Sequence, residues 1–207
     1  MLFGKPAGPR ILASGGASGE GRRALAPLLM LLSGACAGAP ESGFQPLPSE
    51  QAVIHLDHPA FDPASSVDSA ARDARTGATW YVSEVNGDQA LGAIVTSDMP
   101  PGQEAVRRPT EEAVRSIIPP RFRIAWGPAG ETAGPSGTLA YRLFSMGEAE
   151  HGPTLACVAF SQRNGPAGED RQLRDVLYGY LCRYGNRRLE RDVAEDMLTS
   201  ISLTPRP

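Results

Sequence analysis

Short segments of alternating or continuous apolar residues dominate the chain from residue 51 onward. Their lengths and their enrichment in β-branched and aromatic side chains are typical of β-strands. The clearest alternation places Phe122, Ile124 and Trp126 on one face of a strand, with arginine side chains on the other. We therefore expect strands at residues 53–56, 80–85, 91–97, 121–126, 139–145, 154–161 and 176–184.

A hairpin turn and two helices complete the expected elements. Asn86-Gly87 separates two of the strands, and both residue types tolerate the positive φ that a two-residue hairpin turn requires. Thr110 is suited to cap a helix at 111–118, which has acidic residues in its first turn and Pro119 after its end.

A longer helix is expected near the end of the chain, from a cap at Asn186 to about residue 200. Its apolar residues recur every four positions, which places them on one helix face. These residues are Leu189, Val193, Met197 and Ile201.

Many strands, a short helix between them and a longer helix at the end predict an α+β fold. In it, an antiparallel sheet is packed with a C-terminal helix and one shorter helix, and is covered on one face. This order of elements is similar to that of the PsbP/Mog1-like domains, which also close with a helix and a short apolar tail.

The N-terminal segment has the features of an export signal. Four basic residues precede an apolar run of 12 residues that ends at Cys36, and this run is too short to span a bilayer as a helix. The sequence Leu32-Ser33-Gly34-Ala35-Cys36 resembles the lipobox of bacterial lipoproteins, although Ser33 replaces the preferred Leu. The resemblance implies that Cys36 is acylated. The alternative is a soluble secreted protein cut after Ala37, at an Ala-x-Ala site.

These features divide the 207-residue chain into an export signal at 1–35, a Pro-rich tether at 36–50 and a single globular domain at 51–207. The expected location is the cell envelope, with the domain lipid-anchored and facing the periplasm. A soluble secreted form is the second possibility.

Charge and composition exclude several functions. The only lysine is Lys5, so lysine-dependent chemistry has no residue in the predicted domain. Removing residues 1–35 takes away four basic residues and one acidic residue, which changes the net charge from −3 to −6. An acidic, exported domain is a poor candidate for binding nucleic acid.

Cys157 and Cys182 lie in two expected strands and are separated by 24 residues. Exported proteins mature in an oxidising compartment, so we expect these two thiols to form a structural disulfide. Such a cross-link stabilises a domain by roughly 3 kcal/mol. No Cys-x-x-Cys motif or flanking histidine points to a redox or nucleophilic role.

Two further clusters carry candidate chemistry. His55, Asp57 and His58 are the densest set of metal-ligand side chains, with His151 the only other histidine. A strand places His55 and Asp57 on one face and His58 on the other, so we expect neither a metal nor a cofactor. The second cluster contains arginines beside a tyrosine-rich strand, as candidates for binding an anionic polymer or headgroup. They are Arg183, Arg187, Arg188 and Arg191.

The sequence contains no catalytic motif, so we expect a non-enzymatic envelope lipoprotein. Its partners would be the membrane, through the lipid anchor, and an envelope protein or polymer. The alternative is a soluble periplasmic enzyme or small-ligand-binding protein.

Overall fold

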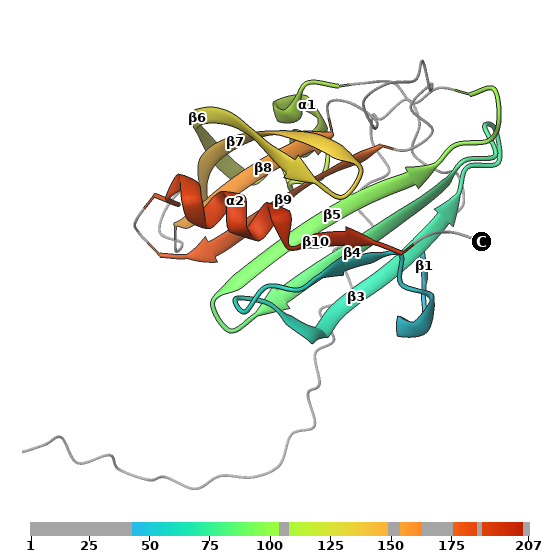
Figure 1. Cartoon of the computed structure of the whole chain (residues 1–207), viewed down its shortest axis with the longest axis horizontal. Helices are drawn as coiled ribbons and strands as arrows, with labels where there is room; N and C mark the ends of the chain where they lie inside the picture. Colours follow the sequence, from blue (N-terminus) through green and yellow to red (C-terminus); the bar gives the residue numbers. More distant parts are fainter. Residues whose placement is uncertain (1–42, 104–107, 149–153, 163–175, 186–187, 205–207) are drawn as a thin grey trace, which may run out of the picture. The chain divides into compact units, whose positions relative to one another are not determined.

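The computed structural model describes residues 43–103, 108–148, 154–162, 176–185 and 188–204, all of which belong to one compact unit. The main sheet contains β1 (Gln45–Pro46), β3 (Asp62–Arg72), β4 (Thr79–Gly87), β5 (Ala90–Asp98), β6 (Phe122–Gly134), β7 (Gly137–Glu148), β8 (Leu155–Gln162) and β9 (Leu177–Tyr184). These eight strands are antiparallel, in the order β1-β3-β4-β5-β9-β8-β7-β6 (Figure 1).

The other elements are small. A two-stranded sheet pairs β2 (Ile54–Leu56) with β10 (Ile201–Leu203), and a 3₁₀ turn, η2, covers Ser49–Gln51. The two helices are α1 (Thr110–Arg115) and α2 (Arg191–Thr199). The structure therefore confirms an antiparallel sheet with a C-terminal helix and one shorter helix, in a fold that strands dominate.

Two meanders meet at the centre of the sheet. Strands β3, β4 and β5 form the first, and β6, β7, β8 and β9 form the second. The last strands of the two meanders pair with each other and so join them into one sheet. This pairing of β5 with β9 runs from Ala90↔Arg183 to Thr96↔Leu177. This pairing brings residues of β5 next to residues of β9 that lie 81 to 93 positions later in the chain.

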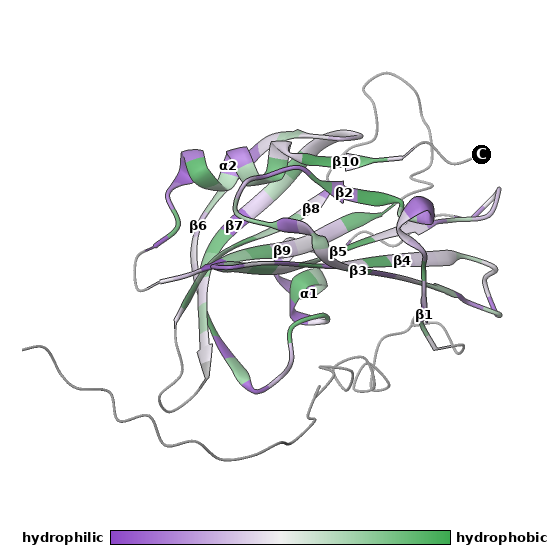
Figure 2. Cartoon of the chain, turned by 90° about the horizontal axis from the view of Figure 1, so that it is seen from below, coloured by the Kyte–Doolittle hydropathy of each residue, from purple (hydrophilic) through white to green (hydrophobic). Residues whose placement is uncertain are grey.

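The sheet has an apolar core on each of its two faces, which we name after the helices that cover them (Figure 2). Because side chains alternate along a strand, Leu177 and Leu181 of β9 lie on the α2 face, and Tyr180 and Cys182 on the α1 face. On the α2 face the core includes Ile94, Val158, Phe160, Met197 and Leu198. On the α1 face it includes Val114, Ile118, Phe144, Met146 and Leu155.

The expectation that one face of the sheet is covered was therefore wrong. Strand β8 is apolar and buried at nearly every position, unlike a strand with one solvated face. A continuous apolar run is typical of a strand covered on both faces. The run at residues 154–161 carried this information in the sequence.

Both helices are shorter than expected. Helix α1 ends at Arg115, and Pro109 precedes it without a side-chain capping bond. The hydroxyl of Thr110 instead lies 2.7 Å from that of Ser161 on β8. Tertiary contact to the sheet has replaced the predicted helix cap.

Helix α2 begins only at Arg191, after Glu190 at the N-cap. The predicted cap, Asn186, lies outside the described residues. The predicted helix face is correct in its buried Met197, but Leu189 precedes the helix and Ile201 begins β10. Both are nevertheless buried in the same core, so the apolar spacing identified core residues and misplaced the helix ends.

The hairpin between β4 and β5 was correctly predicted, but its turn was not. Asn86 and Gly87 still belong to β4, and Asp88-Gln89 forms the turn. Gly87 is needed for another reason: a Cβ atom there would lie 2.1 Å from the carbonyl oxygen of Ala60. The glycine allows the segment after β2 to pack against the strand.

The main sheet begins at Gln45, within the segment predicted as tether, because Gln45 and Pro46 pair with Ala70 and Ser69 of β3. Among the described residues, no helix is long and apolar enough to cross a bilayer.

Candidate functional site

The structure confirms the predicted cysteine pair. Cys157 of β8 and Cys182 of β9 are directly opposite each other, with Cα atoms 4.0 Å apart, and are joined by a disulfide. Both side chains are fully buried on the α1 face. Neither sulfur is therefore available for thiol chemistry, and the bond serves to hold β8 and β9 together.

A row of polar side chains crosses the same α1 face. It lies beside the row that contains the disulfide. The pairing register runs from Glu84 on β4 through Ala93 to Tyr180 on β9. It continues through Ala159 to Arg142 on β7. We call Glu84, Tyr180 and Arg142 the polar row; each is separated from the next by one alanine.

The Arg142 end of the polar row is satisfied. Its guanidinium forms a short ion pair with Glu111 of α1, and its Nε donates to the carbonyl oxygen of Gly127 at 3.0 Å. It also lies over the Trp126 ring, 5.9 Å from the centroid. The hydrogen bond from Arg142 lowers the pKa of Glu111. This end therefore fastens α1 to the sheet.

The Glu84 end is different. Glu84 is half-buried, and burial raises its pKa. Within the described part of the chain, its carboxylate has neither a hydrogen bond nor an ion pair. Tyr180 is 8% exposed, and its pKa is raised to about 12, first by burial and then by the nearby Glu84. Its hydroxyl likewise has no hydrogen-bond partner among the residues that the structure describes.

A third unsatisfied group occurs on β4. Trp80 lies on the same face of this strand as Glu84, four residues earlier, and its indole Nε1 is buried without a hydrogen-bond partner in the described ranges. Buried polar groups in folded proteins are rarely left in this state, and exceptions are informative. Unpaired polar groups thus gather on the β4 side of the α1 face.

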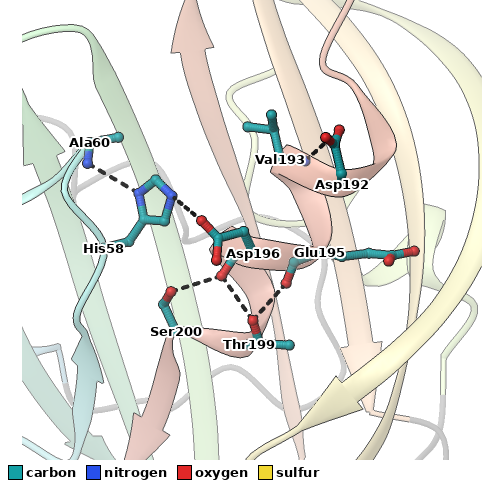
Figure 3. A network of polar contacts seen from close by, with 8 residues as sticks. All are labelled: His58, Ala60, Asp192, Val193, Glu195, Asp196, Thr199 and Ser200. Carbon is teal, nitrogen blue, oxygen red and sulfur yellow. Dashed lines mark hydrogen bonds and ion pairs between the residues drawn. The ribbon is translucent and has the colours of Figure 1, made fainter.

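The predicted histidine cluster is divided between two environments. His58 is buried, and its Nδ1 accepts from the backbone N–H of Ala60 at 3.1 Å (Figure 3). Its Nε2 therefore carries the proton of the neutral ring and faces Asp196 of α2 at 3.4 Å. This contact joins the segment after β2 to the last turn of the helix.

His55 lies on the outer side of β2, where its Nε2 is 2.6 Å from the hydroxyl of Thr204. Asp57 is exposed, and His151 lies outside the described residues. Within the described ranges, no group of three or more His, Cys, Asp or Glu side chains is placed to hold a metal ion. The structure brings His58 to α2 and leaves His55 at the end of the small sheet.

The predicted arginine cluster is exposed where it is described. Arg183, Arg188 and Arg191 are exposed, and Arg187 lies outside the described residues. Alternation along β9 places Arg183 on the α2 face, while Tyr180 is on the α1 face. Arg183 and Tyr180 therefore lie on opposite faces of the strand.

Sequence reasoning missed the polar row. The available signal was a charged residue at an apolar position of an alternating strand: Glu84 follows Trp80 and Val82 on one face of β4. The partners were not visible, because the register that joins β4, β5 and β9 is a property of the folded sheet. Cys36, the predicted lipidation site, lies outside the described residues. The chain matches no protein-family model, no curated protein and no solved structure.

Proposed function

We propose that this chain is an exported cell-envelope protein, lipid-anchored at Cys36, whose domain acts by binding and not by catalysis. The observation that carries the proposal is the buried Cys157–Cys182 disulfide between β8 and β9. Such bonds persist in oxidising compartments and are rare in the cytosol. The apolar run that ends at Cys36 accounts for how the chain reaches such a compartment.

The arrangement of reactive groups favours binding. Both described cysteines are joined to each other, and the His58 ring contacts a backbone amide and a carboxylate. His55 and Thr204 touch at the surface, but no carboxylate of the described residues orients the ring, as a nucleophile–base–acid arrangement requires. What the domain offers instead is a broad sheet, one face of which carries polar groups that have no partner in the described part of the chain.

Metabolic labelling with a fatty-acid analogue tests the anchor. The wild-type chain is expected to incorporate the label and to fractionate with membranes, and Cys36→Ser is expected to do neither. The double variant Cys157→Ser/Cys182→Ser is the matched control, because it removes two cysteines and keeps the acceptor. Equal labelling of the wild type and Cys36→Ser would contradict the proposal.

A second candidate is a soluble periplasmic protein that binds a small ligand, favoured by the half-buried Glu84 and its neighbour in the row, Tyr180, neither of which has a hydrogen-bond partner among the described residues. It differs from the first in fractionation: the protein would appear in the soluble periplasmic fraction with residue 38 as its first residue. For the fold, we infer an α+β domain similar to the PsbP/Mog1-like domains, supported by the antiparallel sheet and the closing helix.

A further inference from the structure

We propose that Glu84 and Tyr180 form a binding site for a primary ammonium group on the β4–β5–β9 part of the α1 face. This inference rests on the proposed function only in taking the domain to be a binding domain. It names the chemistry of the ligand: an alkylammonium ion, either a free amine or the side chain of a lysine in a peptide.

The register gives the site its shape. Glu84, Ala93 and Tyr180 occupy adjacent strands in one row, so their backbones are about 4.8 Å apart from strand to strand. Ala93 contributes only a methyl group between two long side chains. On the other side of Glu84, the same row continues to Val67 of β3, which is 50% exposed. In the proposed site the ammonium group lies between these two acceptors, and its alkyl chain lies along the exposed Val67.

The charge of the site selects a cation. Glu84 is a carboxylate that can only accept, and the Tyr180 hydroxyl has free lone pairs. The arginine of the polar row is held by Glu111 and does not compensate Glu84. The burial that raises the pKa of Glu84 also strengthens its attraction for a positive charge.

Ammonium fits better than other cations. Its three donors can serve Glu84, Tyr180 and water at one point, whereas a divalent metal needs three or four convergent ligands. The described residues provide no such group of His, Cys, Asp and Glu. Lys5 is the only lysine side chain in the sequence.

NMR titration of the purified full chain tests the site. We expect n-butylammonium to cause saturable shifts of the Val67, Ala93 and Tyr180 amides and to lower the pKa of the Glu84 carboxyl. The neutral analogue n-pentanol is expected to cause neither change. Equal shifts with both compounds, or no shift with n-butylammonium, would overturn the proposal.

Variants locate the binding. Glu84→Gln is expected to weaken n-butylammonium binding by roughly tenfold or more, because it removes the charged acceptor. Tyr180→Phe should weaken it by about threefold, through loss of one neutral hydrogen bond. Glu50→Gln, at an exposed position in η2, is the matched control and should bind as the wild type does. Wild-type affinity in Glu84→Gln would refute the site even if other shifts persisted.

Two further probes distinguish the sources of the ammonium group. Cadaverine represents a free amine, and the tripeptide Gly-Lys-Gly represents a lysine side chain with its backbone. Tighter binding of one than the other identifies the source, and failure of both to displace n-butylammonium would contradict the proposal. Fatty-acid labelling at Cys36 is an independent result, so the anchor and the ammonium site can fail separately.

Discussion

The two ends of the polar row differ in whether the charged side chain has partners. At the β7 end, Arg142 is matched by Glu111, by a backbone carbonyl and by an aromatic ring. At the β4 end, Glu84 is half-buried with no partner among the described residues. The two positions belong to the same row of the same sheet, so the difference lies in what covers them.

Helix α1 explains the satisfied end. It packs on β7, β8 and β9, and its first turn supplies both Glu111 to Arg142 and Thr110 to Ser161. A carboxylate without such a partner lowers stability, because desolvation is not offset. The presence of Glu84 at an apolar strand position therefore points to a role other than stability.

Removing the disulfide of the sheet that carries both ends of the polar row should have the largest effect on stability. Cys182→Ser is expected to lower the free energy of unfolding by about 2–4 kcal/mol, because the unfolded chain regains the freedom of the loop that the disulfide closes. Denaturant unfolding with and without reductant measures this loss. The double variant Cys157→Ser/Cys182→Ser should be insensitive to reductant, and wild-type protein equally insensitive to it would contradict the prediction.

Two tyrosines sharpen the comparison between satisfied and unsatisfied groups. Both have a pKa raised to about 12, but within the described structure only Tyr141 of the two donates a hydrogen bond, to Glu195 of α2 at 2.6 Å. Tyr141→Phe is expected to cost about 1–1.5 kcal/mol, because the partner is a carboxylate. Tyr180→Phe should change stability by less than about 0.5 kcal/mol. Thermal unfolding of both variants checks this, and equal losses would show that the Tyr180 hydroxyl has a partner.

How much of the fold can be predicted from the sequence depends on whether a feature arises from neighbouring residues or from contacts between distant parts of the chain. Local patterns located seven strands and the cysteine pair, because alternation and strand length are properties of adjacent residues. Strand β3 was missed: its sequence is rich in Ala and Ser, and its pairing with β4 stabilises it without help from β propensity. The turn at Asp88-Gln89 was misplaced for a similar reason, since Gly87 serves a contact with Ala60.

The candidate site was less predictable than the fold. Glu84 and Tyr180 are 96 positions apart in the chain, and only the β5–β9 pairing brings them into one row. The histidines were the visible candidates, but His58 is used to join α2 to the rest of the domain. The sequence shows which chemical groups a side chain carries. Whether such a group has a hydrogen-bond or ion-pair partner can be judged only once the pairing register of the strands is known.

The ion pair at the satisfied end of the polar row can be removed by replacing Glu111. Glu111→Gln is expected to cost about 0.5–1 kcal/mol at pH 7, a modest value because both side chains of the pair are more than a third exposed and water screens them. The folded state lowers the pKa of Glu111, so the pair stabilises above the unfolded pKa, and this contribution is lost as pH falls through the folded value. Unfolding from pH 7 to pH 3 should therefore show the variant and wild type converging.

Its control is Glu112→Gln on the same helix turn. Glu112 is 61% exposed and 3.8 Å from Arg108, so its replacement should change stability by less than about 0.5 kcal/mol at any pH. An effect of Glu112→Gln as large as that of Glu111→Gln would show that general charge on α1, and not the Arg142 pair, is responsible.

The smallest expected change in stability is a gain, whereas the other substitutions are expected to lower stability. Glu84→Gln is expected to stabilise the protein by about 0.5 kcal/mol at pH 7, since it removes a desolvated charge and keeps the shape of the side chain. The folded state raises the pKa of Glu84 above its ordinary value of 4.5, so the folded protein binds the proton more tightly than the unfolded chain. Stability then falls as pH rises from the unfolded towards the folded pKa, and the penalty is complete above the folded value.

The variant should accordingly gain stability over wild type at neutral pH and lose that advantage below about pH 4, where both states of the wild type are protonated. Chemical unfolding across this range measures the difference, with Glu50→Gln as the exposed control that should show none. A destabilised Glu84→Gln at pH 7 would mean that the carboxylate is already compensated within the fold. Because a bound ammonium group would supply that compensation in the wild type alone, adding n-butylammonium should reverse the order of the two proteins.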